Sequence, residues 1–282
     1  MLQAPQRTGL SGPTLIRLLT RLTDAEVQQS RQSLSDHLSQ WLGWTDAIAL
    51  SAALNTAPPV IAPGARMFSS AEERECVRVR TTLADAIASD TAATAAKRVA
   101  PARAPAKKLA AVLAEDAFDY SSFRQRYLSL QHTMETSVGN LRSRLRGMVA
   151  ARNGEWTRLA VVDAIMDRAL LPKERALLGA IPKLLQVHFD RLRKAEEAAL
   201  AQAAEQALAE PGSPANAAAN VQGDTEAPGV DAAQAGTSPP APAITAGAWL
   251  DTFRADMRAV LLAELDVRLQ PVEGLLAALR TS

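Results

Sequence analysis

The sequence of 282 residues predicts an all-α fold, a multi-helix bundle built from long amphipathic helices. Two observations support this prediction. Apolar residues recur in steps of three and four over long stretches, which places their side chains on one face of a helix. Aromatic residues make up only 4% of a chain that is 48% hydrophobic. This balance, rich in alanine and leucine, favours closely packed helices over strands.

The longest patterned stretch runs from Tyr120 to Leu171, and we expect the other helices to pack around it. Its first half carries apolar residues at helical spacing: Leu130, Met134, Val138, Leu141, Leu145 and Met148. A second run follows a break near Asn153 and Gly154: Trp156, Leu159, Val162, Ile165 and Met166. The break leaves two alternatives open, one long helix or two helices folded into a hairpin. In either case the seam needs partner helices to cover it, as in a coiled coil.

The N-terminal half is expected to begin with a flexible segment, residues 1–12, and to continue into a helical domain, residues 13–209. Within that domain Trp41 and Trp44 lie in a largely apolar segment. Buried aromatic side chains contribute large apolar areas, so packing in the core is the default interpretation of both tryptophans. A groove that binds another molecule is the alternative.

A basic loop is expected at residues 97–108, because two prolines interrupt any helix there. Its charged residues are all basic: Lys97, Arg98, Arg103, Lys107 and Lys108. They form a candidate contact for phosphate or for an acidic protein surface. A solvated connector is the alternative, and it is favoured because no aromatic residue is interleaved to stack on bases.

Residues 210–247 are expected to form a disordered linker that is rich in proline, alanine and glycine. The segment has too few large aliphatic side chains to offset the entropy of ordering itself. A flexible chain of this length spans about 30–36 Å, which is enough to return the tail to its own domain or to offer it to a partner.

Residues 248–282 are expected to form a pair of C-terminal amphipathic helices separated by Pro271. A pair this small cannot bury its own apolar stripes, so it must dock on another surface, in the same chain or in a partner. Its large apolar side chains form the candidate interaction surface: Trp249, Phe253, Met257, Val260, Leu261, Leu265, Leu275 and Leu276.

Pro172 is also expected at a helix boundary, in the first turn of a new helix.

The sequence contains no catalytic, cofactor-binding or metal-binding pattern, so we expect no enzymatic activity, no cofactor and no small-molecule substrate. The histidines, His37, His132 and His188, are far apart and lack the spacing of zinc ligands. Glycine-rich phosphate loops and the GxSxG turn of hydrolases do not occur. Carboxylate pairs such as Asp163 and Asp167 are common on solvated helix faces and do not by themselves indicate catalysis.

The composition and the N-terminus favour a soluble cytoplasmic protein. A single cysteine, Cys76, excludes an intramolecular disulfide and suits a reducing compartment. The N-terminus has no apolar run of signal-peptide length, and no stretch reaches the ~20 consecutive apolar residues of a membrane span. The formal net charge of +1 gives no overall field to attract nucleic acid or an anionic membrane.

Several stretches of the sequence carry a resemblance to a known family: GLSGPTLIRLLTRLTDA, SLSDHLSQWLGWTDAIALSAAL, RYLSLQHTMETSVGNLRSRLR and MRAVLLAELDVRLQPVEGLLAAL. In them the chain resembles an uncharacterised domain-of-unknown-function family of β-proteobacterial helical proteins, over nearly its whole length apart from the linker. The family has no assigned activity to carry over. Its members are encoded near OmpA-like and MotA/TolQ-like envelope proteins, and the resemblance therefore implies a role accessory to a cell-envelope system.

The sequence thus predicts a non-enzymatic helical scaffold or adaptor, whose apolar stripes contact a protein partner or a second copy of the chain. The alternative is a nucleic-acid-associated protein that uses the basic loop and an arginine-rich helix. The arginines of that helix are dense: Arg124, Arg126, Arg142, Arg144, Arg146, Arg152 and Arg158. They surround the apolar seam instead of forming one stripe, so contact with nucleic acid is the less favoured hypothesis.

Overall fold

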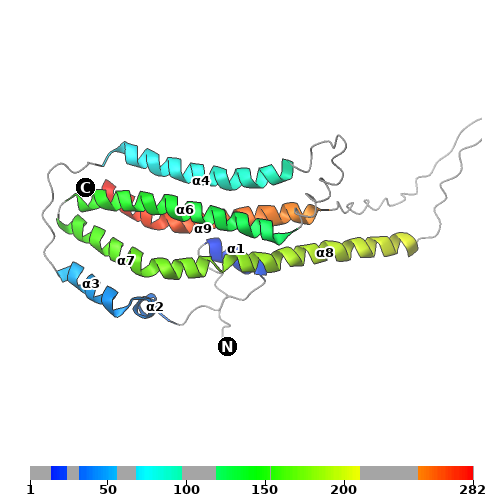
Figure 1. The fold of residues 1–282 in the computed structure, drawn as a ribbon, viewed down its shortest axis with the longest axis horizontal. Coiled ribbons are helices and arrows are strands. Elements are labelled where there is room, and N and C mark those ends of the chain that lie inside the picture. The colour runs from blue at the N-terminus through cyan, green and yellow to red at the C-terminus, as the bar shows by residue number, and fades with distance from the viewer. Residues whose placement is uncertain are drawn as a thin grey trace, which may run out of the picture.

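The computed structural model describes residues 14–23, 32–55, 68–96, 119–152, 154–209 and 247–281. Every regular element in these ranges is an α-helix, which confirms the all-α fold class. The helices are α1 (Thr14–Thr23), α2 (Leu34–Trp41), α3 (Trp44–Asn55), α4 (Ser70–Ala96), α6 (Tyr120–Ala150), α7 (Gly154–Leu178), α8 (Ile181–Ala209) and α9 (Ala248–Arg280). They form an elongated bundle, with α4 along one side, α6 and α9 in the middle, and α7 with α3 along the other side (Figure 1).

α6 and α7 form a hairpin, so the chain reverses between the end of α6 at Ala150 and the start of α7 at Gly154 (Figure 1). The seam predicted for α6 is buried over most of its length: Met134, Val138, Leu141, Leu145 and Met148. On α7 the prediction is confirmed in part: Ile165 is buried and Trp156 is half-buried against the core, whereas Leu159 is 39% exposed. Thr157 and Ala160 are also buried, because α7 packs against both α6 and α3.

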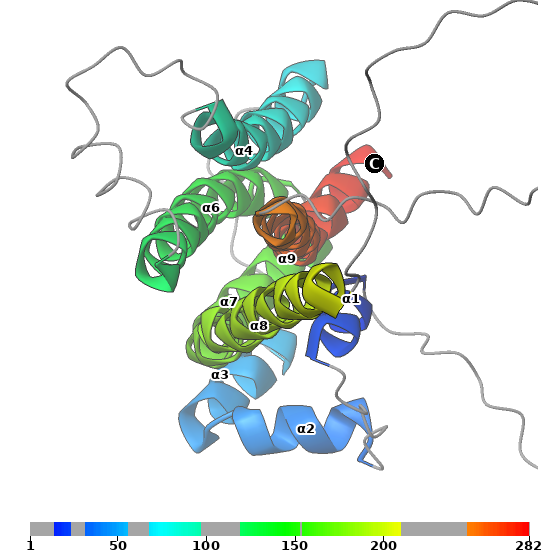
Figure 2. The ribbon, with the colours of Figure 1, turned by 90° about the vertical axis from the view of Figure 1, so that its right-hand side faces the viewer.

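α9 is the central helix of the bundle. It packs against α1, α4, α6 and α8, and viewed end-on it lies among them (Figure 2). Its buried residues extend from Trp249 near one end to Leu279 near the other. The C-terminal tail therefore covers the seam of α6 within the same chain.

The residues of the candidate interaction surface are part of this central helix. Each of them is at most 7% exposed: Trp249, Phe253, Met257, Val260, Leu261, Leu265, Leu275 and Leu276. They form an intramolecular core, and in this fold they offer no exposed surface to a partner. The physical reason is that α9 is apolar on more than one side, and such a helix is buried by several neighbours at once.

The expected division of the tail at Pro271 is wrong, because α9 is a single helix that continues through this residue. A proline inside a helix removes one backbone hydrogen bond and costs about 3 kcal/mol. Beyond it Val272, Leu276 and Leu279 are buried, and burial of each such side chain stabilises the fold by about 1.5–3 kcal/mol. Packing on the far side of Pro271 therefore outweighs the loss.

Pro172 also lies inside a helix, α7, and not at the boundary predicted for it. The chain turns instead at Gly179 and Ala180, between α7 and α8. A Cβ atom on Gly179 would lie 2.8 Å from the backbone oxygen of Arg175, so the turn requires glycine at this position. Pro182 then occupies the first turn of α8, where its missing N–H is not needed.

Several predicted segments lie outside the described residues. These are the N-terminal residues 1–12, the linker up to residue 246, and the basic loop with Lys97, Arg98, Arg103, Lys107 and Lys108. Among the helices that the structure does describe, none has both the length and the apolar character that crossing a membrane requires.

Replacing Leu261 by alanine tests the central position of α9. Leu261 is fully buried, and its neighbour Leu262 is 36% exposed on the same helix. Leu261→Ala is expected to lower the free energy of unfolding by about 2–5 kcal/mol, because it leaves a cavity in the core. Leu262→Ala should cost less than about 1 kcal/mol. Urea unfolding followed by circular dichroism measures both, and equal losses would contradict the central packing of α9.

Candidate functional site

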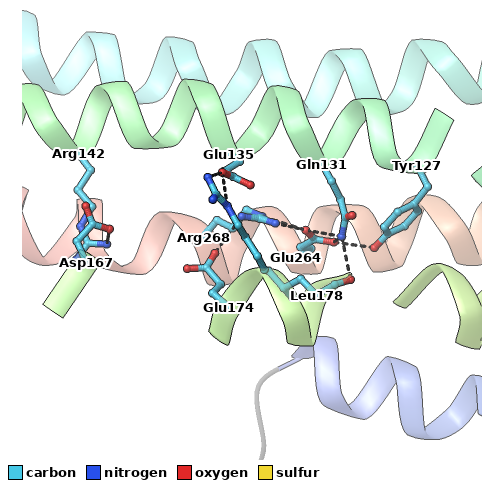
Figure 3. A network of polar contacts seen from close by, with 10 residues as sticks. Tyr127, Gln131, Glu135, Arg142, Asp167, Glu174, Leu178, Glu264 and Arg268 are labelled. Carbon is cyan, nitrogen blue, oxygen red and sulfur yellow. Dashed lines mark hydrogen bonds and ion pairs between the residues drawn. The ribbon is translucent and has the colours of Figure 1, made fainter. Parts of the chain in front are cut away.

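A buried polar network joins α6, α7 and α9 in the middle of the bundle (Figure 3). At its centre lies Glu264 of α9, whose exposed fraction is 0%. Tyr127 and Gln131 of α6 point toward its carboxylate, and Arg268 lies one turn further along α9. We call these four residues the Glu264 cluster.

Both carboxylate oxygens of Glu264 accept hydrogen bonds. The Tyr127 hydroxyl donates to Oε2 at 2.7 Å, and the Gln131 amide donates to the two oxygens at 3.0 and 3.1 Å. The Arg268 guanidinium donates to Oε1 at 2.8 and 2.9 Å, and its Nη1 donates to Glu174 of α7 at 3.0 Å. The buried carboxylate is thus paired with a guanidinium, as a charge in an apolar interior must be.

The protonation state of Tyr127 suits its place as a donor. Burial, reinforced by the neighbouring negative charge of Glu264, raises the pKa of Tyr127 well above its ordinary value. The phenol therefore keeps its proton at all physiological pH values. It can donate to Glu264 without ever bringing a second negative charge into the cluster.

The cluster also fixes how α9 is placed along α6 and α7. The Gln131 amide donates to the carbonyl of Leu178 at 3.1 Å. Leu178 is the last residue of α7, where helix carbonyls lack an intrahelical partner. A slide of α9 by one turn, about 5.4 Å, would separate Glu264 from Tyr127 and Gln131 and leave the carboxylate short of partners. The hydrogen bonds therefore define one register for α9.

A second set of charged residues ties α6 to α7 nearer the hairpin turn. Arg142 donates to Asp163 and to Asp167, at 2.6 Å in each case. Arg146 donates to Asp163 at 2.7 Å and to Asp167 at 2.6 Å. The carboxylate pair noted in the sequence thus supplies the counter-ions of two arginines on the facing helix.

Other arginines of the predicted arginine-rich helix also have partners in the protein. Arg152, in the turn after α6, donates to the carbonyl of Leu279 at 2.6 Å, at the C-terminal end of α9. Cations are favoured there because of the helix dipole. Arg144 lies 3.7 Å from Glu75 of α4. These contacts reduce the positive charge that α6 presents to a nucleic acid.

The geometry of the Glu264 cluster favours a structural role over a catalytic one. Its groups are buried and bonded to one another. A groove of about 360 Å³ lies elsewhere, between α4 and α6, and is lined by Arg78, Val79, Thr82, Leu83, Ala86, Thr133 and Ser137. Within the described part of the chain no group of three or more histidine, cysteine, aspartate and glutamate side chains is arranged to hold a metal ion.

A separate feature lies at the edge of the bundle. α3 buries none of its residues, and three of its large apolar side chains are open to solvent: Trp44 is 83% exposed, Ile48 53% and Leu54 52%. We call these three residues the α3 face. Core packing, the default interpretation of Trp44 from the sequence, is therefore wrong. Trp41, at the end of α2, is half-buried.

The sequence of the whole chain can be matched to one known family. A family model described as a protein of unknown function (DUF3348) matches residues 1–281. The chain belongs to this family. The match confirms the resemblance to an uncharacterised family that the sequence motifs indicated. No curated protein and no solved structure matches the chain. The function of this DUF3348 member must therefore be inferred from its own geometry.

The sequence-based interpretation of this DUF3348 member missed the Glu264 cluster. Glu264 and Arg268 are four residues apart, the spacing of an ordinary surface ion pair on a helix. A signal was nevertheless present, because Glu264 lies between Leu261 and Leu265 in an apolar stripe. A charged residue in such a stripe indicates a buried partner, but only the tertiary structure identifies that partner as Tyr127 and Gln131 of α6.

Glu264→Gln tests the importance of the buried charge. The substitution keeps the shape of the side chain but leaves Arg268 without its closest carboxylate, so the free energy of unfolding should fall by about 3–5 kcal/mol. Glu273→Gln is the matched control, because Glu273 lies on the same helix and pairs with Arg80 at the surface, at 3.0 Å. Loss of this surface ion pair should lower the free energy of unfolding by about 0–1 kcal/mol. Equal effects in urea unfolding would contradict the structural role of Glu264.

Two carboxylates beside the cluster are expected to respond to pH in opposite directions. The hydrogen bond from Arg175 lowers the pKa of Glu135 below 4.5, whereas burial raises the pKa of Glu174 above 4.5. Glu135 therefore stabilises the fold above pH 4.5, and this contribution is lost as pH falls through its lowered pKa. The contribution of Glu174 has the opposite sign: it is present below pH 4.5 and is lost as pH rises through its raised pKa.

Glutamine variants at the two positions measure these contributions. Relative to the wild type, Glu135→Gln should become less stable as pH rises, and Glu174→Gln should become more stable. Urea unfolding from about pH 2.5 to 8 follows both differences, because the contribution of Glu135 changes below pH 4.5 and that of Glu174 changes above it. Shifts in the same direction for the two variants would show that their environments have been assigned incorrectly.

Proposed function

We propose that this protein is a non-enzymatic helical scaffold that binds another protein through the α3 face. The exposure of Trp44 carries the proposal. A tryptophan side chain contributes a large apolar area when it is buried, and tryptophan is enriched at the centres of protein interfaces. With 83% of its surface open to solvent, Trp44 makes no such contribution to the fold of its own chain.

The attachment of α3 supports the outward orientation of this face. α3 packs against α7, where Asp46 and Arg168 form an ion pair at 3.3 Å. Asp46 is the one charged residue of α3, and it is used in this attachment. The α3 face itself therefore carries no charge. A complementary partner surface is apolar and uncharged, such as the apolar face of a second helix.

The size of the face favours a transient contact. α3 has 12 residues and is about 18 Å long. Stable interfaces bury about 800 Å² on each partner, which is more than one face of a helix this short supplies. A partner that associates and dissociates fits this area better than a permanent subunit.

The proposal includes a location and a context for the scaffold. We place it in the cytoplasm, where the lone Cys76 suits a reducing environment. Burial raises the pKa of the Cys76 thiol, which keeps it protonated and unreactive. The family resemblance supports a role accessory to a cell-envelope system.

Site-specific crosslinking in the native cell tests this function. A photoreactive amino acid is placed at Ser51, an exposed position on the same side of α3, and at Arg193 of α8 as a control. The position at Ser51 should yield a defined crosslinked protein, and the control position should not. Equal crosslinking at both positions, or none at Ser51, would contradict the proposal.

The captured protein is then purified and its affinity measured directly. The double variant Trp44→Ser, Ile48→Ser should bind more than about tenfold more weakly. Each of the two substitutions is expected to reduce the free energy of binding by more than about 1 kcal/mol. The same variant should unfold within about 0.5 kcal/mol of the wild type, because both side chains are exposed. Unchanged affinity in the double variant would remove the α3 face from the interface. Light scattering distinguishes a second copy of this chain from a different protein.

A further inference from the structure

A second polar cluster, with a buried histidine at its centre, lies where α1 packs against α8 and α9. His188 of α8 is 3% exposed at this junction. Its Nε2 lies 2.9 Å from Oδ2 of Asp256 on α9, and its Nδ1 lies 3.2 Å from Nη2 of Arg191, one turn further along α8. We call these three residues the His188 cluster.

The partners of the ring decide which of its nitrogens carries hydrogen. A guanidinium group has only N–H donors, so Arg191 donates to Nδ1, and Nδ1 is the bare nitrogen. Nε2 then carries hydrogen and donates to the Asp256 carboxylate. This arrangement fits the neutral imidazole. A proton added at Nδ1 would point at the N–H groups of Arg191 and place two positive charges 3.2 Å apart.

The same guanidinium holds the end of α1. Nη2 of Arg191 donates to the backbone carbonyl of Leu22 at 2.8 Å, near the C-terminal end of α1, where carbonyls lack helical partners. A longer ion pair between Arg21 and Asp256, at 3.6 Å, also joins this end to α9. α1 has 10 residues, and a helix this short depends on its tertiary contacts. Arg191 therefore couples the docking of α1 to the state of His188.

The remaining groups around the ring leave this coupling intact. Asp256 of α9 accepts a hydrogen bond from Nε2 whether the ring is neutral or charged. Arg21 of α1 adds a further positive charge beside Asp256. From α6, Tyr120 belongs to the adjoining aromatic cluster, and burial raises the pKa of Tyr120 to about 12, so it stays neutral. Phe253 contributes an uncharged ring, with its centroid 6.2 Å from that of the imidazole.

We propose that the His188 cluster is a pH-sensitive switch that releases the C-terminal end of α1 when His188 gains a proton. Protonation of Nδ1 removes the acceptor for Arg191, and repulsion moves the guanidinium away from Leu22. Release uncovers Leu15 and Leu22, which are buried in the core cluster, together with the apolar surface beneath them. The switch acts on α1 alone and is independent of the α3 face.

Hydrogen exchange of the full-length protein tests the switch. Amide exchange of residues 14–23 is measured by mass spectrometry near pH 8 and near pH 5.5, on either side of the range in which histidine changes charge. Rates are corrected for the intrinsic pH dependence of exchange. Protection of α1 should fall about tenfold to a hundredfold at the lower pH, because a hydrogen bond from a charged donor is lost. Protection of α7 should not change. Equal corrected protection of α1 at both pH values would overturn the proposal.

His188→Gln separates the switch from general destabilisation by acid. A glutamine amide can donate to Asp256 and accept from Arg191, and it does not titrate, so α1 should be equally protected at both pH values. Arg191→Gln should lower the protection of α1 at both. The matched control is Arg193→Gln, because Arg193 is a half-exposed residue of the same helix that pairs with Glu197. It should behave as the wild type. A pH dependence that persists in His188→Gln would overturn the proposal.

The hydrogen position on the ring gives a test that needs no variant. Nitrogen-15 chemical shifts of His188 in the wild-type protein at neutral pH should show hydrogen on Nε2 and a bare Nδ1. Hydrogen on Nδ1 instead would exclude the hydrogen bond from Arg191 to His188, and it would overturn the proposal even if the variants failed to fold.

Discussion

Glu264 places a full negative charge inside the bundle, and the arrangement of α6, α7 and α9 satisfies it. The apolar side chains of α9 provide most of the free energy that buries the helix, but apolar contacts alone tolerate more than one register. The carboxylate does not, because losing a partner in a buried pair costs about 3–5 kcal/mol. The partners of this carboxylate therefore select a single position for α9, the last helix of the chain. These partners are Tyr127 and Gln131 of α6 and Arg268 of α9, and Arg268 in turn pairs with Glu174 of α7.

The same helices use their other charges within the protein. Arg142 and Arg146 pair with Asp163 and Asp167 across the hairpin, and Arg152 binds the end of α9. These arginines, which the sequence offers as a contact for nucleic acid, are therefore paired with groups on neighbouring helices. Among the described residues the α3 face is an apolar surface that the fold leaves open, and our proposal of contact with another protein rests on it.

The Glu264 cluster and the His188 cluster serve α9 and α1 differently. In the Glu264 cluster the donors keep their protons, since a guanidinium and a buried phenol do not change charge near neutral pH. In the His188 cluster the central group is an imidazole, the type of side chain that serves as a switch between pH 5 and 8 in proteins. The first cluster holds the central helix under all physiological conditions. The second lies at the attachment of a short peripheral helix, where a change of charge can act without unfolding the bundle.

The helical nature of the chain, the seam of α6 and the break before α7 were determined by the sequence itself, because the spacing of apolar residues is a local property. The pattern of Leu261 and Leu265 likewise marked α9 as apolar. The tertiary structure decided the rest. Pro271 was expected to divide the tail and Pro172 to begin a new helix, but packing on both sides of each keeps the helices continuous.

Trp44 was predicted to be a core residue but is exposed. The prediction failed because nothing in the segment around Trp44 shows whether another helix will cover it. Glu264 and His188 each have partners on other helices, and these partners are more than sixty residues away in the chain. Local spacing cannot bring such residues together, since their contacts exist only after the hairpin has formed and α9 has returned to it.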